Sequence, residues 1–239
     1  MKQLNILVSV ILLAVFTHIT ASGISHHLAC IMDSNRSWTR SLARPDWYKH
    51  RVSILFPLYA AIATALERRI PHLSVYLCSQ ENMKRSNEEK QCIYNSLYAL
   101  LTDKKADFFK HSIAVCIYGD TQYMPPHITP YIDTIHHETQ TGKNLTSHVI
   151  FSYSGVYDIV REINHIHTDS QQTHLPIPSH ILLSYVTTND IPDPDIIMRT
   201  GNRNCLSTPY VQQTAYRDIY FLQKHWPELT QEDFDWVIE

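Results

Sequence analysis

The chain lacks the cysteine patterns that mark disulfide-stapled or zinc-binding folds. Its five cysteines are odd in number and include no Cys-x-x-Cys pair. A disulfide framework uses cysteines in even sets, and a zinc knuckle uses closely spaced pairs of ligands. Neither kind of fold is indicated, and we expect the cysteines to be buried free thiols.

An excess of positive charge is also missing. The 239 residues carry 20 Lys and Arg against 23 Asp and Glu, which gives a formal net charge of -3. Proteins that bind nucleic acids usually present a basic field to the phosphate backbone. We therefore expect no nucleic-acid partner, while a local pocket for a small phosphate would not show in this sum.

No apolar run is long enough to cross a bilayer comfortably, since a spanning helix needs about 20 apolar residues. A nearly continuous apolar run, Leu4–Phe16, follows Lys2 and precedes small residues. This pattern fits a signal peptide with Ala21 as the cleavage point, and it equally fits an anchor at a membrane surface. Both interpretations stay open: export, or a location in the cytoplasm or at the cytoplasmic face of a membrane.

Beyond the N-terminal segment 1–22, residues 23–239 read as a single α/β domain without internal repeats. Short apolar runs typical of strands alternate with longer amphipathic stretches typical of helices, which predicts a mostly parallel sheet flanked by helices. A polar stretch at 165–178 reads as a loop. The expected strands are 28–32, 73–78, 113–118, 148–153 and 196–198, and the expected helices are 47–69, 88–109 and 128–141.

Charged and polar side chains follow three of these strands, in the segments 33–40, 79–85 and 199–207. The carboxyl ends of parallel strands meet at one edge of a sheet, where ligands bind. An acid, several guanidiniums, hydroxyls and amides suit a polyanion held together with a divalent cation. These residue types predict a phosphate-handling site.

Five motifs in collinear order sharpen this prediction. Residues 27–38 read H-L-A-C-I-M-D-S-N-R-S-W, residues 79–85 read S-Q-E-N-M-K-R, and Gly119-Asp120 follows. Residues 199–207 begin R-T-G and end L-S, and residues 213–227 include A-Y-R-D-I-Y-F and W-P. Together they resemble the signatures of the cis-prenyltransferases, also known as undecaprenyl diphosphate synthases or isoprenyl transferases, over most of the chain.

The resemblance implies a twisted sheet that encloses a hydrophobic tunnel, usually in a homodimer. It implies an enzyme that condenses isopentenyl diphosphate with an allylic diphosphate such as farnesyl diphosphate, with Mg²⁺ as cofactor, to form a cis-polyprenyl diphosphate. Asp33 and Asp218 are the implied magnesium ligands, and Asp33 and Asn82 the implied catalytic residues. The implied substrate-binding residues are Ser34, Asn35, Arg36, Ser37, Trp38, His50, Ser79, Glu81, Arg85, Arg199 and Ser207.

The chain departs from the family pattern at several arginines. The arginine before Trp38 is replaced by Ser37, with Arg36 one position earlier, and the arginine before Ser207 is Cys205, with Arg203 nearby. Lost guanidinium contacts weaken diphosphate binding unless displaced arginines compensate. Leu77, where the family often has alanine, predicts a short product if its side chain faces the tunnel.

Three alternatives follow from these departures and from the histidines. In the first, the chain is a catalytically impaired accessory subunit of a prenyltransferase, which would place it in a heteromer in place of the expected homodimer. In the second, it couples small diphosphates into short or irregular products. The stretch His165-Ile166-His167-Thr168-Asp169 resembles alternating metal ligands. It supports a different class, a secreted metal-dependent hydrolase.

Overall fold

The computed structural model describes residues 25–41, 46–169, 177–206, 214 and 216–239. Six strands of this part form one sheet in the order β3-β4-β2-β1-β5-β6, and every neighbouring pair is parallel. The predicted α/β fold with a parallel sheet is therefore confirmed. The strands are β1 (His27–Ile31), β2 (His72–Tyr76), β3 (Ile113–Gly119), β4 (Leu145–Phe151), β5 (Ile196–Arg199) and β6 (Asp218–Phe221).

Strand β6 was not predicted, because it has no apolar run that would reveal it. It lies at the edge of the sheet, and its four residues are all partly or fully exposed. Only its pairing with β5, which aligns Arg199 with Phe221, identifies it as a strand.

The helices depart from prediction in several places, and those over 35–41, 155–164, 179–185 and 231–238 were not predicted at all. The predicted helix 88–109 is broken at Lys104 into two helices, and the stretch predicted as a loop from 165 is helical as far as Asp169. The longer helices are α3 (Asp46–Glu67), α4 (Asn87–Asp103), α6 (Thr129–Thr139) and α7 (Gly155–Asp169), and the shorter ones are α2 (Asn35–Ser41), α5 (Lys105–Lys110), α8 (Ser179–Tyr185) and α9 (Gln231–Ile238).

The loop prediction was wrong at 165–169 because these residues continue a helix that begins at Gly155, before the stretch. Val156, Val160 and Ile163 lie at positions i, i+4 and i+7, so they share one helix face. The prediction gave more weight to the polar composition of 165–178 than to the helical spacing of the apolar residues just before it.

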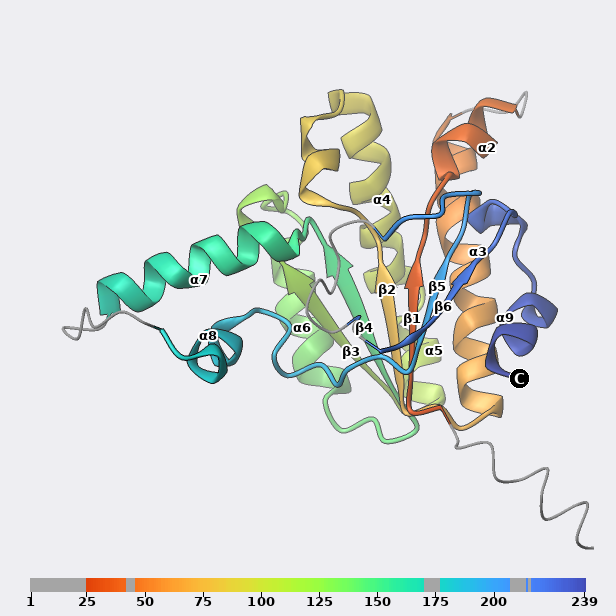
Figure 1. Cartoon of the computed structure of the whole chain (residues 1–239). Coiled ribbons are helices and arrows are strands. Elements are labelled where there is room, and N and C mark those ends of the chain that lie inside the picture. Colours follow the sequence, from red (N-terminus) through yellow and green to blue (C-terminus); the bar gives the residue numbers. More distant parts are fainter. Residues whose placement is uncertain (1–24, 42–45, 170–176, 207–213, 215) are drawn as a thin grey trace, which may run out of the picture.

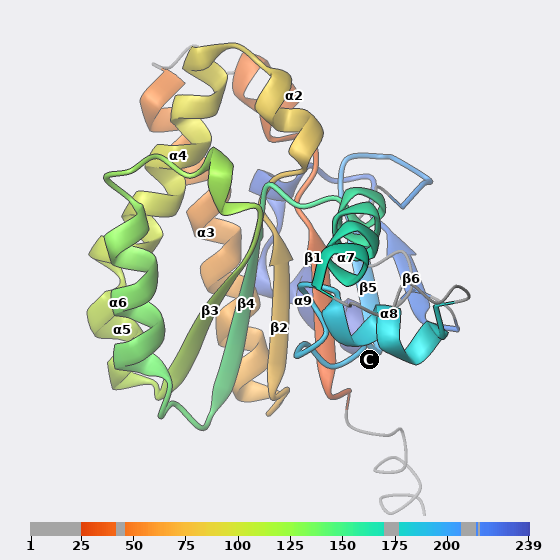
Figure 2. The same cartoon turned by 90° about the vertical axis from the view of Figure 1, so that its left-hand side faces the viewer.

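Helices cover the two faces of the sheet unequally (Figures 1 and 2). Helices α3, α4, α5 and α6 lie against one face and bury the larger core, which includes Leu58, Leu97 and Trp226. A smaller cluster, including Ile31, Tyr76 and Ile150, lies on the other face, on the side of α7 and α8. No helix among the described residues is long and apolar enough to cross a membrane.

Three histidines from adjacent strands contact one another on the less covered face. The rings of His72 and His148 stack with centroids 5.4 Å apart, and His27 lies 6.0 Å from His72 and 5.9 Å from His148. His27 Nδ1 donates to the carbonyl oxygen of Pro192 (2.6 Å), so its Nε2 accepts from the Ser74 hydroxyl (2.7 Å). A neutral His27 ring satisfies both contacts, with Nδ1 as donor and Nε2 as acceptor.

Burial lowers the pKa of all three histidines and so favours their neutral state. It lowers the pKa of His148 to about 3, with help from the neighbouring imidazoles, and the pKa of His27 to about 4 against the opposing effect of the Pro192 carbonyl. Burial also lowers the pKa of His72. Unfolding restores an ordinary pKa near 6.5, so the unfolded chain binds more protons below that pH.

We therefore predict that the free energy of unfolding falls as the pH is lowered from 6.5 toward 4, by roughly 3 kcal/mol for His27 alone. Substituting His148→Gln should flatten this dependence, whereas His137→Gln, which changes an exposed histidine on α6, should leave it as it is. Urea denaturation over this pH range measures both slopes. Equal slopes in the wild type and the His148 variant would contradict the assignment.

Candidate active site at the carboxyl edge of the sheet

The first site residue, Asp33, stands just beyond the carboxyl end of β1. Its backbone N–H donates to the Thr200 hydroxyl (2.9 Å), and its Oδ1 accepts from the backbone N–H of Ser34 (2.8 Å). Ser34 has a φ of 69°, so the chain turns sharply there before α2 begins at Asn35. The turn leaves the Asp33 side chain 40% exposed, which makes it accessible to a ligand.

Asp33 is paired with Arg199, the last residue of β5. Because β1 and β5 are adjacent and Ile31 is aligned with Arg199, the two side chains meet above the sheet, with Arg199 Nη2 2.7 Å from Asp33 Oδ2. Arg199 also donates from Nη1 to the carbonyl oxygen of Cys205. Its side chain is only 6% exposed, and its Nε is buried without a described partner.

A close approach between two loops fixes this pair in place. Gly201 has a φ of 88°, and a Cβ atom there would lie 2.0 Å from Ser34 Oγ. A residue with a side chain would therefore both strain the backbone and push the Ser34 loop away. Gly201 is the glycine of the R-T-G motif that the sequence analysis singled out.

A cavity of about 150 Å³ opens beside Asp33 between the loop after β1, the loop after β2 and helix α4. It brings together half of the predicted site residues, from two segments about 50 positions apart in the sequence. Its floor is apolar and comes from Met32, Ile54, Leu77 and Ile93. Its polar walls come from Asp33, Ser34, Asn35, Arg36, Ser37, Asn82, Arg85, Glu89 and Arg203.

Three guanidiniums line this cavity and make it suited to an anion. Burial lowers the pKa of Arg85, and nearby Arg36 adds to that effect, while Glu89 and Asp33 oppose it. An arginine remains charged under such shifts, so its positive charge is poorly solvated and available to a phosphate. Both Arg36 and Arg203, the displaced arginines noted in the sequence, lie in the lining.

Glu89 was not found by sequence reasoning. It belongs to the first turn of α4, and its Oε1 lies 3.3 Å from Arg36 Nη1. Nothing local to the sequence marks it, because it meets Arg36 only through the fold. Its carboxylate pairs with the Arg36 guanidinium at the cavity.

Asn82 and Ser79 form a short turn at the cavity wall. Asn82 Oδ1 accepts from the backbone N–H of Ser79 (3.4 Å), which is the capping arrangement of the 3-10 helix Gln80–Lys84. Glu81 is exposed on that helix and does not line the cavity. Trp38, on α2, is half-buried and also lies outside the lining.

The structure does not bring Asp218 to Asp33 within one chain. Asp218 opens β6 and is level with Ile196, which is level with Leu28 on β1. Five residues separate Leu28 from Asp33, so the two carboxylates stand about 15 Å apart along the sheet. Ser207 and the His50 side chain lie outside the described residues.

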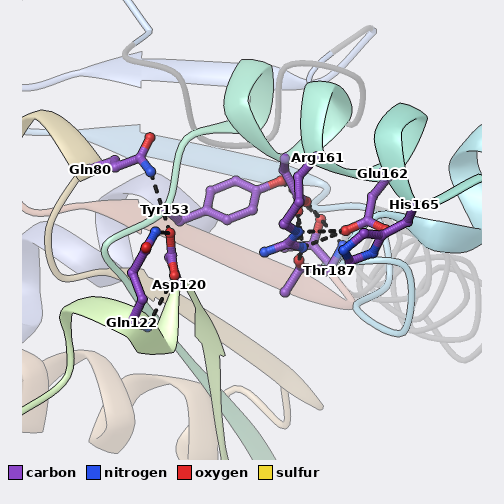
Figure 3. A network of polar contacts seen from close by, with 10 residues as sticks. Gln80, Asp120, Gln122, Tyr153, Arg161, Glu162, His165 and Thr187 are labelled. Atoms are coloured by element: carbon purple, nitrogen blue, oxygen red, sulfur yellow. Dashed lines mark hydrogen bonds and ion pairs between the residues drawn. The ribbon is translucent and has the colours of Figure 1, made fainter. Parts of the chain in front are cut away.

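A second polar network lies beside the cavity, where β3 and β4 end (Figure 3). Asp120, from the Gly119-Asp120 motif, accepts from Gln80 Nε2 (3.4 Å) and from the backbone N–H of Gln122 (3.1 Å). Further along α7, Arg161 is ion-paired with the buried carboxylates of Asp158 and Glu162. This network anchors α7 to the segment before β5, since Asp158 accepts from the Thr187 backbone N–H.

The histidine stretch on α7 forms no metal site. His165 and His167 lie two positions apart on a helix, where side chains diverge, and His165 instead contacts Glu162. Among the described residues, no group of three or more His, Cys, Asp and Glu side chains could hold a metal ion. The histidine stretch therefore gives no support to the hydrolase alternative.

One magnesium ion shared with a phosphate would nevertheless fit the Asp33 loop. Magnesium is commonly bound through one or two protein carboxylates, with the remaining ligands from phosphate and water oxygens. The Asp33 carboxylate is accessible, and the neighbouring Asn35 Oδ1 is buried without a described hydrogen-bond partner. These oxygens are the donor type that magnesium prefers.

Comparisons with known proteins agree with this geometry. The undecaprenyl diphosphate synthase family model matches residues 31–239. A geranylgeranyl-diphosphate-specific tritrans,polycis-undecaprenyl-diphosphate synthase from Thermococcus kodakarensis is 29% identical over 223 residues, covering 90% of this chain and 83% of the relative. An isoprenyl transferase from Thermotoga maritima is 28% identical over 218 residues, covering 90% and 93%.

Solved structures show the same fold. Lavandulyl diphosphate synthase from Lavandula x intermedia, solved with dimethylallyl diphosphate, superposes with a TM-score of 0.82 at 22% identity and covers 90% of this chain and 94% of its own. A probable undecaprenyl diphosphate synthase from Campylobacter jejuni gives a TM-score of 0.73 at 23% identity, covering 89% and 93%. With the family match over residues 31–239, the chain belongs to the undecaprenyl diphosphate synthase family of cis-prenyltransferases.

Proposed function

We propose that this chain is an active prenyltransferase that condenses isopentenyl diphosphate with an allylic diphosphate. The observation that carries the proposal is the Asp33–Arg199 pair beside a cavity that three further arginines line. Two diphosphates carry several negative charges, and the cavity and its rim supply the matching guanidiniums. Names of relatives from Thermococcus kodakarensis and Buchnera aphidicola, which state allylic diphosphate specificities, support the same reaction class.

The two substrates bind on opposite sides of Asp33. The allylic diphosphate occupies the cavity, where Asn35, Arg36 and Arg85 contact its phosphates and the apolar floor takes its prenyl chain. Isopentenyl diphosphate binds on the Arg199 side, where Arg199 and Ser207 contact it. Arg199 then exchanges one partner, the Asp33 carboxylate, for a phosphate oxygen.

Asp33, with Asn35 nearby, would hold a magnesium ion against the diphosphate. When bound, this ion supplies positive charge that stabilises the departing diphosphate. Asp218 would reach such an ion only from another chain, since it stands at the opposite edge of its own sheet.

The reaction forms one carbon–carbon bond and breaks one carbon–oxygen bond. The double bond of isopentenyl diphosphate supplies the electron pair for the new bond to the allylic carbon, and the diphosphate leaves with the electrons of the broken bond. A proton then leaves the former isopentenyl group. Arg36 and Arg85 stabilise the charge that develops on the leaving oxygens.

Asn82 orients groups at the cavity wall and does not accept this proton. A neutral amide is a poor base, and its oxygen already accepts the Ser79 N–H. Its amide nitrogen remains able to donate to a phosphate oxygen or a water in the cavity.

The test of the proposal is product formation from farnesyl diphosphate and labelled isopentenyl diphosphate, with magnesium and with a chelator. Labelled prenyl diphosphate that forms only with magnesium supports it. No product from farnesyl, geranyl or dimethylallyl diphosphate would favour the accessory-subunit alternative, and a short or irregular product would favour the small-diphosphate alternative.

Arg36 is predicted to replace the arginine that the first motif lacks. Substituting Arg36→Ala removes a charge-assisted phosphate contact and should raise the KM for the allylic substrate at least about tenfold. Steady-state kinetics with varied allylic diphosphate measures the change. Arg40→Ala, on the same helix but outside the cavity lining, serves as the matched control and should leave the KM unchanged.

Leu77 is predicted to limit the length of the product. Its side chain lies in the apolar floor of the cavity with Ile54 and Ile93, and it packs against the core on the α3 and α4 side. Substituting Leu77→Ala should open the floor and lengthen the product, because packed walls yield poorly to overfilling. As a control, Leu229→Ala removes the same side-chain volume from a part of the core that lies away from the cavity. Chromatography of extracted products showing equal lengths for the wild type and the Leu77 variant would contradict this role.

The functional unit is proposed to be a homodimer built on α7 and α8. Val156, Val160 and Ile163 form an exposed apolar stripe on α7, which projects from the sheet in Figure 1, and α8 adds three large exposed residues, Ile181, Leu183 and Tyr185. A second copy would cover this surface. Light scattering should give twice the chain mass, and Val160→Glu should reduce it to one chain mass. A wild-type chain that is monomeric at micromolar concentration would overturn this arrangement.

A further inference from the structure

One residue of the cavity carries a charge that opposes the proposed anion. Among the described residues, the lining includes three guanidiniums and two carboxylates, Asp33 and Glu89. Asp33 is paired with Arg199, which lies outside the lining, and is the proposed magnesium ligand. Glu89 has no part in the proposed reaction. A carboxylate beside a polyanion repels it, so Glu89 lowers the affinity of the cavity for a diphosphate.

Glu89 faces Arg36 between the starts of two helices. Arg36 is the second residue of α2 and Glu89 the third of α4, and both helices begin near the upper end of the molecule in Figures 1 and 2. Glu89 Oε1 lies 3.3 Å from Arg36 Nη1, with 30% of the Glu89 side chain and 48% of the Arg36 side chain exposed. Exposed ion pairs are worth at most about fivefold in an equilibrium constant. Arg36 can therefore exchange Glu89 for a phosphate oxygen.

The start of α4 presents Glu89 to a second arginine as well. The Ser86 hydroxyl caps this helix by accepting from the backbone N–H of Glu89 (3.3 Å), which fixes the backbone at that point. Burial and the neighbouring Arg36 lower the pKa of Arg85, and the Glu89 carboxylate acts against both effects. Glu89 thus compensates part of the positive charge of two arginines in the lining.

A diphosphate that binds Arg36 competes with Glu89 for the guanidinium. Its phosphate oxygens carry more charge than one carboxylate and form charge-assisted hydrogen bonds with guanidiniums, so a diphosphate can displace Glu89. The displaced carboxylate then stands beside a ligand of like charge, which opposes binding. Glu89 therefore weakens diphosphate binding in two ways, through its pairing with Arg36 and through repulsion.

We propose that Glu89 competes with diphosphate for Arg36 and thereby limits inhibition by the inorganic diphosphate that the reaction releases. This inference rests on the proposed function, in which each new bond leaves one inorganic diphosphate in the cavity. That diphosphate has to leave before the next allylic diphosphate binds. Glu89 acts through Arg36 and is a positioning residue, not a catalytic one.

Calorimetric titration with inorganic diphosphate, in a buffer with a chelator, tests the competition without turnover. Glu89→Gln keeps the size of the side chain and removes its charge, so the variant should bind at least about fivefold more tightly than the wild type. Glu88→Gln is the matched control, since Glu88 lies in the same helical turn but outside the cavity lining. It changes the net charge equally and should bind within about twofold of the wild type.

A gain of the same size in both variants would overturn the proposal in favour of an effect of net charge. Weaker binding by Glu89→Gln would also overturn it, because Glu89 would then support the anion site. A damaged fold weakens binding, so a gain in affinity separates the proposed role from a structural one.

A double-variant cycle tests whether the effect passes through Arg36. In the Arg36→Gln background the competition is absent, so Glu89→Gln should improve binding by at most about twofold. Equal gains in the two backgrounds would show repulsion through space without competition and would contradict the proposal.

Steady-state kinetics supplies a second readout. Glu89→Gln should lower both the KM for the allylic diphosphate and the inhibition constant for inorganic diphosphate, whereas Arg36→Ala raises the KM. Unchanged or raised constants in an active Glu89 variant would overturn the proposal. The predicted order of diphosphate affinities in a chain that forms no prenyl product would support the role of Glu89 and refute only the proposed function. No binding of inorganic diphosphate by the wild type would contradict both.

Discussion

The ion pair between Asp33 and Arg199 is the contact around which the site is arranged. It joins the carboxyl ends of two neighbouring strands whose residues are 166 positions apart, and it places a nearly buried guanidinium against an accessible carboxylate. Removing one partner would leave a buried charge without compensation. The sharp turn at Ser34 and the absence of a side chain at Gly201 both allow the two loops to approach closely enough for this ion pair to form.

The carboxyl edge of the same parallel sheet gathers the chemistry of the candidate site. Loops after the strands hold its carboxylate, guanidiniums and amides. Family membership establishes the fold and the class of enzyme. The proposed reaction joins two diphosphates, so these groups have to meet at one edge, as the carboxyl ends of parallel strands do.

Sequence patterns predicted the parts of this structure that follow from local rules. Apolar runs located five strands, and the motif residues Asp33, Arg36 and Arg85 converge on one cavity as predicted. The edge strand β6 was missed because it is half-exposed and has no apolar run. The start of α7 was missed although its apolar residues recur at helical spacing. Glu89 could not be predicted, because its meeting with Arg36 depends on how α4 docks. Asp218 shares a motif with site residues but stands at the other edge, which only the strand register reveals.

The central claim is that Asp33 acts on a diphosphate through charge and not through packing. The most direct measurement compares magnesium-dependent prenyl transfer by the wild-type chain and by Asp33→Asn, a substitution that keeps shape and removes the charge. The account predicts that the variant still folds, with a lower free energy of unfolding because the Arg199 guanidinium loses its carboxylate. It also predicts a loss of at least about a hundredfold in kcat/KM, as expected for a group that acts on the developing charge. A variant that folds normally and transfers prenyl groups at close to the wild-type rate would contradict it.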